Sequence, residues 1–300
     1  MVATRLRYKF NAPDTYYLDL NKDLSRHHRK LIRQKGITTV YGGYMVDSDG
    51  NRVDLAVAPN NWVTRVSINR AFRIWKKLNA MTLKQSGGTA PKYSDFKVLL
   101  TGQHLGSNTA DAVDAAGQPI VGTSSDWVYS QLTSYDPVES ADGVTLTPDR
   151  FNMFITGNAH VAGVGGGDVW SRIALIKSWV DSKAIPENNA SDPNYTPDHP
   201  TDPLNNLFDS SDTLDDHIPV YQSSGDLAPY DYDEVQGALH GSSGGNNLQR
   251  VSTAITLSSG ASPVQPIHGF QAICGLVQVT VQGSTAMELV LDVESDTEGF

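Results

Sequence analysis

Two glycine-rich stretches of this 300-residue chain are similar to motifs that carry chemistry. The first, "GSSGG" at 241–245, matches G-x-S-x-G and would make Ser243 a nucleophile, but that motif needs a strand before the serine and a helix after it. Its flanks, "QGALH" and "NNLQR", belong to a Gly/Ser/Asn-rich loop. The second, "GVGGGD" at 163–168, lacks the lysine with which a phosphate loop reaches its ligand. We interpret both as flexible connections and predict no enzyme activity, no catalytic residue and no bound cofactor.

Histidines and carboxylates that could ligate a metal are present, but not at ligand spacing. His27 and His28 are adjacent, so on a helix their side chains point about 100° apart and cannot share an ion. The chain contains no H-x-H and no H-E-x-x-H pattern. The acidic stretches 191–203 and 209–217 could supply oxygen ligands for Ca²⁺, although without the EF-hand spacing. Solvated negative surface is the alternative for these stretches, and the one that we favour.

The single cysteine, Cys274, lies in the apolar run "PIHGFQAICGLVQVTV" at 266–281. One cysteine excludes an internal disulfide and a multi-cysteine zinc site. Because nothing adjacent would stabilise a thiolate, we interpret Cys274 as a small buried apolar residue. A pair of carboxylates for glycoside hydrolysis would have to face each other at a defined separation, and the sequence singles out no such pair.

Charge is unevenly divided along the chain. Residues 1–100 carry 18 Lys+Arg and 7 Asp+Glu, a net charge of +11, whereas residues 101–300 carry 5 and 26, a net charge of −21. The two sum to the net charge of −10 of the whole chain. This division predicts either a protein whose two ends face different partners or a solvated surface that is sorted by sequence.

Much of the positive charge lies on two predicted helices. In 16–35, Tyr17, Leu20, Leu24, His28 and Leu31 recur at helical spacing, and Gly36 is expected to end the helix. The basic residues of this segment suit an anionic membrane surface or a nucleic-acid backbone, the alternative being an ordinary amphipathic helix packed on its own domain. They are Arg26, Arg29, Lys30 and Arg33. A second amphipathic helix is predicted over 67–84 and is also basic.

The remaining elements are mostly strands. We predict a hairpin at 36–59 around Asp49-Gly50 and a third helix at 168–184, capped by Asp168. The parity switch within 266–281 indicates a bulge or a strand covered on both faces. Further strands are predicted at 92–102, 126–136, 150–157, 250–258 and 287–294. No stretch is apolar for the length of a membrane span, and the N-terminus lacks the apolar core of a signal peptide, so we expect a soluble protein made in the cytoplasm. The pattern predicts an all-β fold of antiparallel sandwiches with a few helical insertions.

Seven stretches, taken in order, carry a family resemblance. They are "YYLDLNKDLSRHHRKLIRQKG", "NNWVTRVSINRAFRIWKKLN", "DWVYSQLTSYDP", "RFNMFITGNAH", "IALIKSWVDSKAIPE", "DPLNNLFDSSD" and "HGFQAICGLVQV". Together they resemble segments of the major capsid proteins of the double jelly-roll lineage. The similarity is greatest to the capsid proteins of the FLiP-like single-stranded DNA phages (Finnlakeviridae) and extends more distantly to the corticoviruses.

The resemblance implies two jelly-roll β-sandwiches in tandem, which we expect at 1–125, together with the basic helix, and at 126–300. It implies homotrimeric, pseudo-hexagonal capsomers in an icosahedral shell over an internal lipid membrane, located in the virion after synthesis in the host cytoplasm. Expected partners are other copies of the chain, minor vertex or penton proteins, the membrane and, indirectly, the genome. Arg26, Arg29, Lys30 and Arg33 would then face inward.

The alternative function is a jelly-roll module that binds carbohydrate. Exposed aromatic side chains would form the sugar platform of such a module; Tyr195, Tyr230 and Tyr232 are the candidates. A missing signal peptide and missing disulfides weigh against a secreted module.

Overall fold

The computed structural model describes the chain in eleven segments. The described residues are 3–47, 50–85, 94–105, 109–120, 127–133, 150–157, 161–162, 170–181, 248–256, 263–283 and 286–295. The chain divides into two compact units, Met1–Trp179 with Val235–Phe300, and Val180–Glu234. Almost all of the second unit lies outside the described residues.

Strands outnumber helices among the described residues and pair mainly antiparallel, which confirms the prediction of a mainly antiparallel β fold. The elements in chain order are β1 (Thr4–Phe10), β2 (Thr15–Asp19), α1 (Leu20–His28), β3 (Ile37–Val46), β4 (Arg52–Val57), α2 (Trp62–Gln85), β5 (Gln131–Thr133), β6 (Arg150–Phe154), β7 (Val161–Ala162), β8 (Trp170–Ala174), α3 (Leu175–Asp181), β9 (Gln249–Ile255), β10 (Val264–Ile273), β11 (Leu276–Gln282) and β12 (Met287–Ser295).

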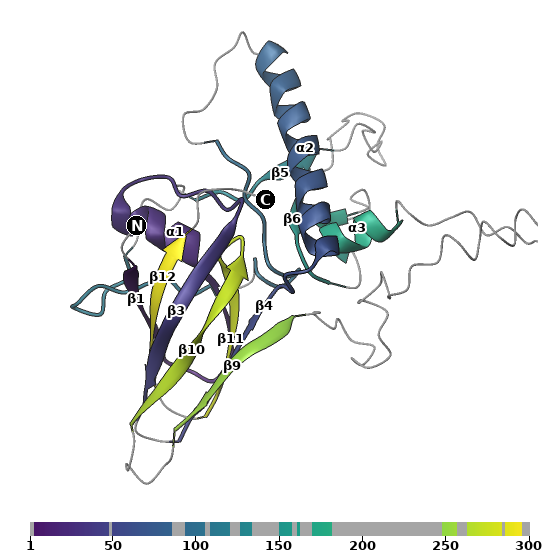
Figure 1. Cartoon of the computed structure of the whole chain (residues 1–300). Coiled ribbons are helices and arrows are strands. Elements are labelled where there is room, and N and C mark those ends of the chain that lie inside the picture. Colours follow the sequence, from purple (N-terminus) through teal and green to yellow (C-terminus); the bar gives the residue numbers. More distant parts are fainter. Residues whose placement is uncertain are drawn as a thin grey trace, which may run out of the picture. The chain divides into compact units, whose positions relative to one another are not determined.

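The two ends of the chain together build an eight-stranded sandwich. The first four strands pair antiparallel, one to one, with the last four: β1 with β12, β2 with β11, β3 with β10 and β4 with β9. This double ribbon is wrapped so that β12 also pairs with β3, and β11 with β4. Two sheets result, in the orders β1-β12-β3-β10 and β2-β11-β4-β9, with one layer over the other (Figure 1). Eight strands wrapped into two sheets in this order form a jelly roll.

Alternating side chains build the core of this sandwich. Along β1, Leu6, Tyr8 and Phe10 are buried, while Arg5 and Arg7, at alternate positions, lie on the outer face and pair with acidic residues of β12. Because successive side chains of a strand point to opposite faces, one face is buried and the other is exposed to solvent. Other fully buried apolar side chains of the core are Leu18, Met45, Leu55, Val279, Leu289 and Leu291. Because β12 is a central strand of its sheet, the apolar C-terminal strands pack against the N-terminal ones.

Residues 58–248 form an insert between the neighbouring strands β4 and β9. Its described part contains a third sheet in the order β5-β6-β8-β7, in which β6 and β8 run parallel. Residues 94–98 of the predicted strand 92–102 form no strand, but the backbone of Leu99 makes an isolated bridge to β6 and hydrogen-bonds to Met153 and to Ile155. Helix α2 begins after Asn61, whose Oδ1 accepts a hydrogen bond from the Thr64 N–H at 2.8 Å. This helix includes and extends the one predicted at 67–84.

Two of the predicted helices and the predicted hairpin differ from the structure. The segment predicted as a helix from residue 16 begins with β2, whose residues pair with β11, and the helix ends at His28 because Arg29 adopts a left-handed conformation with φ of 51°. Residues 36–59 are not a hairpin, since β3 and β4 enter different sheets. Residues Trp170–Ala174 of the predicted third helix form β8, and only Leu175–Asp181 are helical.

The parity switch at 266–281 is neither a bulge nor a doubly covered strand. The run contains two strands, β10 and β11, separated by a turn in which Cys274 and Gly275 have φ of 56° and 67°. The turn carries the chain from one sheet into the other, so inward-facing positions change parity.

Division of the chain at residue 125 does not describe this sandwich, because its strands come from both sides of that boundary. Among the described helices, none is long and apolar enough to cross a membrane.

Candidate functional site: a buried polar junction at helix α1

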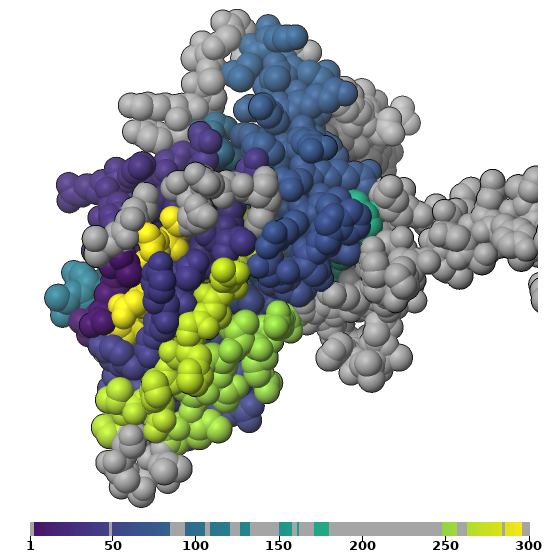
Figure 2. Space-filling model, viewed as in Figure 1, coloured from purple at the N-terminus to yellow at the C-terminus, as the bar shows by residue number. Residues whose placement is uncertain are grey.

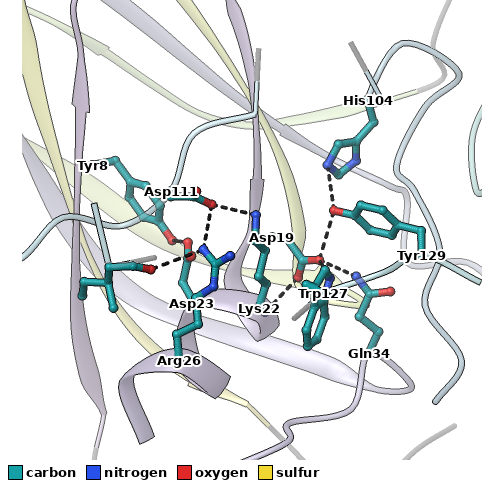
Figure 3. Close-up of polar contacts among 11 residues, drawn as sticks. Tyr8, Asp19, Lys22, Asp23, Arg26, Gln34, His104, Asp111, Trp127 and Tyr129 are labelled. Atoms are coloured by element: carbon teal, nitrogen blue, oxygen red, sulfur yellow. Dashed lines mark hydrogen bonds and ion pairs between the residues drawn. The ribbon is translucent and has the colours of Figure 1, made fainter. Parts of the chain in front are cut away.

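A cluster of charged and aromatic side chains lies where helix α1 meets the insert (Figure 3). We call it the polar junction. Its members are Tyr8 of β1, Asp19 at the end of β2, Lys22, Asp23 and Arg26 of α1, Gln34, and His104, Asp111, Trp127 and Tyr129 of the insert. Residues far apart in sequence are therefore joined by polar contacts rather than by apolar packing alone.

Asp19 is the centre of the junction. It is the N-cap of α1, and its Oδ1 accepts a hydrogen bond from the Lys22 backbone N–H at 3.1 Å. Such a cap satisfies a helix N–H that would otherwise have no partner. Its Oδ2 accepts from Gln34 Nε2 at 2.7 Å, from Trp127 Nε1 at 2.8 Å and, more weakly, from the Tyr129 hydroxyl at 3.4 Å. One carboxylate thus links the helix, the segment after it and the insert.

Burial dominates the proton affinity of Asp19. Desolvation raises the pKa of this carboxyl to about 6, although the hydrogen bonds from the Lys22 N–H, Trp127 and Gln34 and the charge of Lys22 act in the opposite direction. Burial disfavours the charged form, and donors aimed at the oxygens only partly restore it. At neutral pH Asp19 is therefore mainly a carboxylate held by its donors.

Asp23 lies one helical turn further along α1 and is less well satisfied. Its Oδ2 accepts a hydrogen bond from the Tyr8 hydroxyl at 2.8 Å. Its Oδ1 is buried and has no hydrogen-bond partner in the part of the chain that the structure describes. Desolvation raises the pKa of Asp23 to about 7, and the nearby carboxylates of Asp111 and Asp19 add to the rise. Asp23 is accordingly the side chain of the junction that is closest to its protonation midpoint at neutral pH.

The cations of α1 pair with an aspartate of the insert. Asp111 Oδ1 lies 2.7 Å from Lys22 Nζ and 3.1 Å from an Arg26 guanidinium nitrogen. Arg26 also donates to the Ile120 carbonyl oxygen at 3.3 Å. The side chains of Lys22 and Arg26 are each only 13% exposed, so these ion pairs are shielded from solvent and salt. They fasten the segment around Asp111 to the helix.

His104 is held neutral at the other side of the junction. Burial lowers the pKa of this histidine to about 3, and the charge of Lys22 lowers it further. Its Nδ1 accepts from the Leu100 N–H at 3.1 Å, which leaves Nε2 as the protonated nitrogen. Nε2 faces the Tyr129 hydroxyl at 3.4 Å, and that hydroxyl faces Asp19. The donors therefore point in one direction, from His104 through Tyr129 to Asp19.

These contacts keep ionisable side chains buried, and they position β2, α1 and the insert relative to one another. The ring of His104 stacks on Tyr17 of β2 with centroids 4.9 Å apart, and the Thr101 hydroxyl donates to the Tyr17 hydroxyl at 3.1 Å. Breaking one partner of such a network leaves a buried group unsatisfied, which costs more than the bond itself contributed. We assign to the junction the role of fixing the insert to the sandwich.

The four basic residues predicted as a contact site separate into two groups. Arg26 is largely buried and belongs to the junction. Arg29, Lys30 and Arg33 are exposed just beyond α1, although Arg33 lies 3.6 Å from Asp95. The four side chains therefore do not form one open surface.

The histidines considered as metal ligands and the single cysteine have other surroundings in the structure. The rings of His27 and His28 meet edge to face with centroids 5.2 Å apart, and His28 Nε2 lies 2.9 Å from the Thr4 hydroxyl oxygen. No group of three or more metal-ligating side chains occurs within the described segments. Cys274 is fully buried, as predicted, and burial raises the pKa of its thiol to about 12.

Several predicted features lie outside the described residues. They are Ser243, the glycine-rich stretch 163–168, the acidic stretches 191–203 and 209–217 proposed for Ca²⁺, and the aromatic residues Tyr195, Tyr230 and Tyr232.

Sequence reasoning missed most of the junction. A local signal existed for Asp19, an N-cap residue type just before an apolar helical pattern. No local signal connects it with Trp127, which is 108 residues away, or joins Lys22 to Asp111, which is 89 residues away.

No family model, no curated protein and no solved structure matches the chain.

Proposed function

We propose that the chain is a viral major capsid protein, a shell subunit that works by self-association. The observation that carries the proposal is the strand order of the sandwich, because eight strands wrapped into two sheets are the building unit of many viral capsids. The ordered similarity of seven stretches to double jelly-roll capsid proteins gives independent support from the sequence.

The strand order alone is shared with lectin and cupin domains. The shell function therefore also draws on the connectivity of the chain. Both termini contribute strands to one sandwich, and a long insert leaves it between β4 and β9. In the proposal this insert contains the second jelly roll, which would stand beside the first within each subunit. The parallel pairing of β6 with β8 departs from a wholly antiparallel roll, so an experimental structure of the insert is the test of this finer part.

The polar junction fits such a subunit as an internal fastening. A shell protein must hold its parts in one relative arrangement while its sides bind neighbours, since small shifts within a subunit would be repeated in every contact. Charged pairs and hydrogen bonds between α1 and the insert supply that rigidity. Three subunits would form a pseudo-hexagonal capsomer, and capsomers an icosahedral shell over an internal membrane, with minor proteins at the vertices.

Size-exclusion chromatography followed by negative-stain electron microscopy of the full chain tests the proposal. Trimers, or shells and shell fragments, are the expected result. A protein that stays monomeric over a wide range of concentration and salt, and that is retained on a carbohydrate matrix, would instead establish the sugar-binding alternative. Purification of particles from infected cells would test the virion location directly, because the chain should then be their most abundant protein.

A further inference from the structure

Helix α2 presents a basic surface that the polar junction does not use. It runs for 24 residues from Trp62 to Gln85 and carries six Lys and Arg but no Asp or Glu. Between Arg73 and Lys84 no side chain is buried. A helix of this length spans about 36 Å. Along its second half one face, which includes Trp75, Leu78 and Leu83, is half-buried and the rest is exposed.

The exposed charges are arranged in a line. Arg73, Lys77 and Lys84 follow one another at spacings of four and seven, which places them within about 40° of each other around the helix. All three are exposed, and we call them the basic stripe. Ile74 and Met81, 43% and 40% exposed, form a parallel apolar line beside it. The basic stripe is therefore bordered by two partly exposed apolar side chains.

The opposite side of α2 is already occupied. The rings of Phe72 and Trp75 lie against Phe96 with centroids 5.6 and 6.0 Å apart, and Lys35 Nζ sits 4.3 Å from the centre of the Phe72 ring. Within the described segments, these aromatic contacts lie on the side of α2 away from the basic stripe. Figure 2 shows α2 as a blue ridge on the surface of the molecule.

We propose that the basic stripe of α2 docks onto an acidic surface of a second copy of this chain. Charge complementarity within the sequence favours this occupant, because residues 101–300 carry a net charge of −21 and a second copy therefore brings a large excess of Asp and Glu over Lys and Arg. Two different surfaces that attract in this way make a head-to-tail contact, which propagates into rings or lattices rather than stopping at a dimer. The inference rests on the proposed function, in which copies associate, and names the surface responsible.

Such a contact has a measurable electrostatic signature. Opposite charges steer association and are screened as the Debye length falls from about 10 Å at 0.1 M salt to about 3 Å at 1 M. Ile74 and Met81 would supply the apolar centre of the interface, and the stripe its specificity. An anionic lipid surface or a nucleic acid would attract the same stripe. The excess of Asp and Glu in residues 101–300 favours a second copy, because binding to lipid or nucleic acid does not involve those residues.

Sedimentation velocity of the full chain tests the inference with two matched variants. The triple variant Arg73→Gln, Lys77→Gln, Lys84→Gln removes three charges from the stripe. The control Arg29→Gln, Lys30→Gln, Arg33→Gln removes three exposed charges beyond α1. Circular dichroism checks that both remain folded. We expect the native chain to associate at 50 mM NaCl and to dissociate at 500 mM, the stripe variant to associate at least tenfold more weakly, and the control to stay within about twofold of native.

Each other result overturns the inference in a distinguishable way. Association of the stripe variant at native strength, or an equal loss in the control, would leave the shell function standing and remove the role of α2. A native chain that remains monomeric throughout would remove both. Stripe-dependent flotation with vesicles of 30% phosphatidylserine, or stripe-dependent retention of single-stranded DNA, without any effect on self-association would assign the stripe to that partner instead.

Discussion

Helices α1 and α2 have similar sequences in one respect: each combines an apolar line with several basic residues. The structure uses the two in opposite ways. In α1 the cations Lys22 and Arg26 are largely buried and paired with Asp111 of the insert. In α2 the cations Arg73 and Lys77 are exposed on a stretch without buried side chains.

The difference arises from the groups that the rest of the chain places nearby. Carboxylates of three segments converge on α1, whereas α2 contains none of its own and is held by aromatic contacts on its far side. A buried cation must be paired, and an exposed one gains little from pairing. The same basic pattern therefore stabilises the fold at α1 and leaves cations of α2 exposed at the surface.

Removal of the Asp19 carboxylate should have the largest effect on the α1 side of this comparison. In Asp19→Ala the side chains of Gln34 and Trp127 and the Lys22 N–H lose their acceptor. Orphaned buried donors and a lost cap should lower the free energy of unfolding by about 3 kcal/mol. Urea unfolding followed by circular dichroism measures it. Asp19→Asn keeps one acceptor oxygen and should lose less; equal stability of all three proteins would contradict the assignment.

The pH dependence of stability should show that burial in the junction destabilises the charged form of Asp23. Its pKa is raised from 3.8 to about 7 in the folded protein, so the folded state binds the proton more tightly than the unfolded state does. Its contribution to stability is therefore present below pH 4 and is lost as the pH rises through 7. Asp23→Asn keeps an acceptor for Tyr8 and removes the titration.

The measurement is the stability of the native chain minus that of Asp23→Asn, at pH 8 and at pH 5. On going to pH 5 this difference should shift in favour of the native chain by about 3 kcal/mol, since pH 5 lies two units below the folded-state pKa of about 7 and one pKa unit corresponds to roughly 1.4 kcal/mol. Asp19 and His104 titrate in both proteins, the former adding stability and the latter removing it as the pH falls, so subtraction largely cancels them. A difference that does not change with pH would contradict the assignment.

A direct contrast between the helices comes from removing one arginine of each. Arg26→Met leaves Asp111 with a single cation and the Ile120 carbonyl oxygen without its donor, and should cost about 1–2 kcal/mol of stability. Arg73→Met should change stability by less than about 0.5 kcal/mol, because the side chain is exposed. Thermal or urea unfolding of both variants provides the comparison. Similar losses in the two would show that burial does not distinguish these cations.

The periodicity of apolar residues correctly predicted elements whose formation depends mainly on neighbouring residues. The alternation of apolar residues identified the late strands β9 and β12, and the helical spacing identified α2, whose first turn the sequence placed a few residues late. It failed at β2, because Tyr17, Leu20 and Leu24 match a helical face while hydrogen bonds to β11, more than 250 residues away, hold Tyr17 in a strand. It also failed at Cys274, since a non-glycine residue with positive φ is uncommon and gives no turn signal.

The pairing of the two chain ends is a property that no window of the sequence contains. β1 and β12 are each recognisable only as an alternating strand, and neither sequence indicates that the partner lies more than 270 residues away. The junction is hidden for the same reason. Asp111 lies in a segment without periodicity, and its value as a partner for Lys22 and Arg26 arises only from folding.

Glycine substitutions at the end of α1 and in the interior of α2 should have small effects of opposite sign on stability. Arg29 caps α1 in the left-handed conformation, where its backbone N–H donates to the Ser25 carbonyl oxygen. Glycine adopts this conformation without steric cost, so Arg29→Gly should raise stability by about 0.5–1 kcal/mol. The matched change in α2, Ala80→Gly, should lower stability by about 1 kcal/mol or less, because it adds backbone freedom inside a helix. Opposite signs in urea unfolding would place the end of α1 at Arg29; a loss in both would mean that the helix continues through this residue in solution.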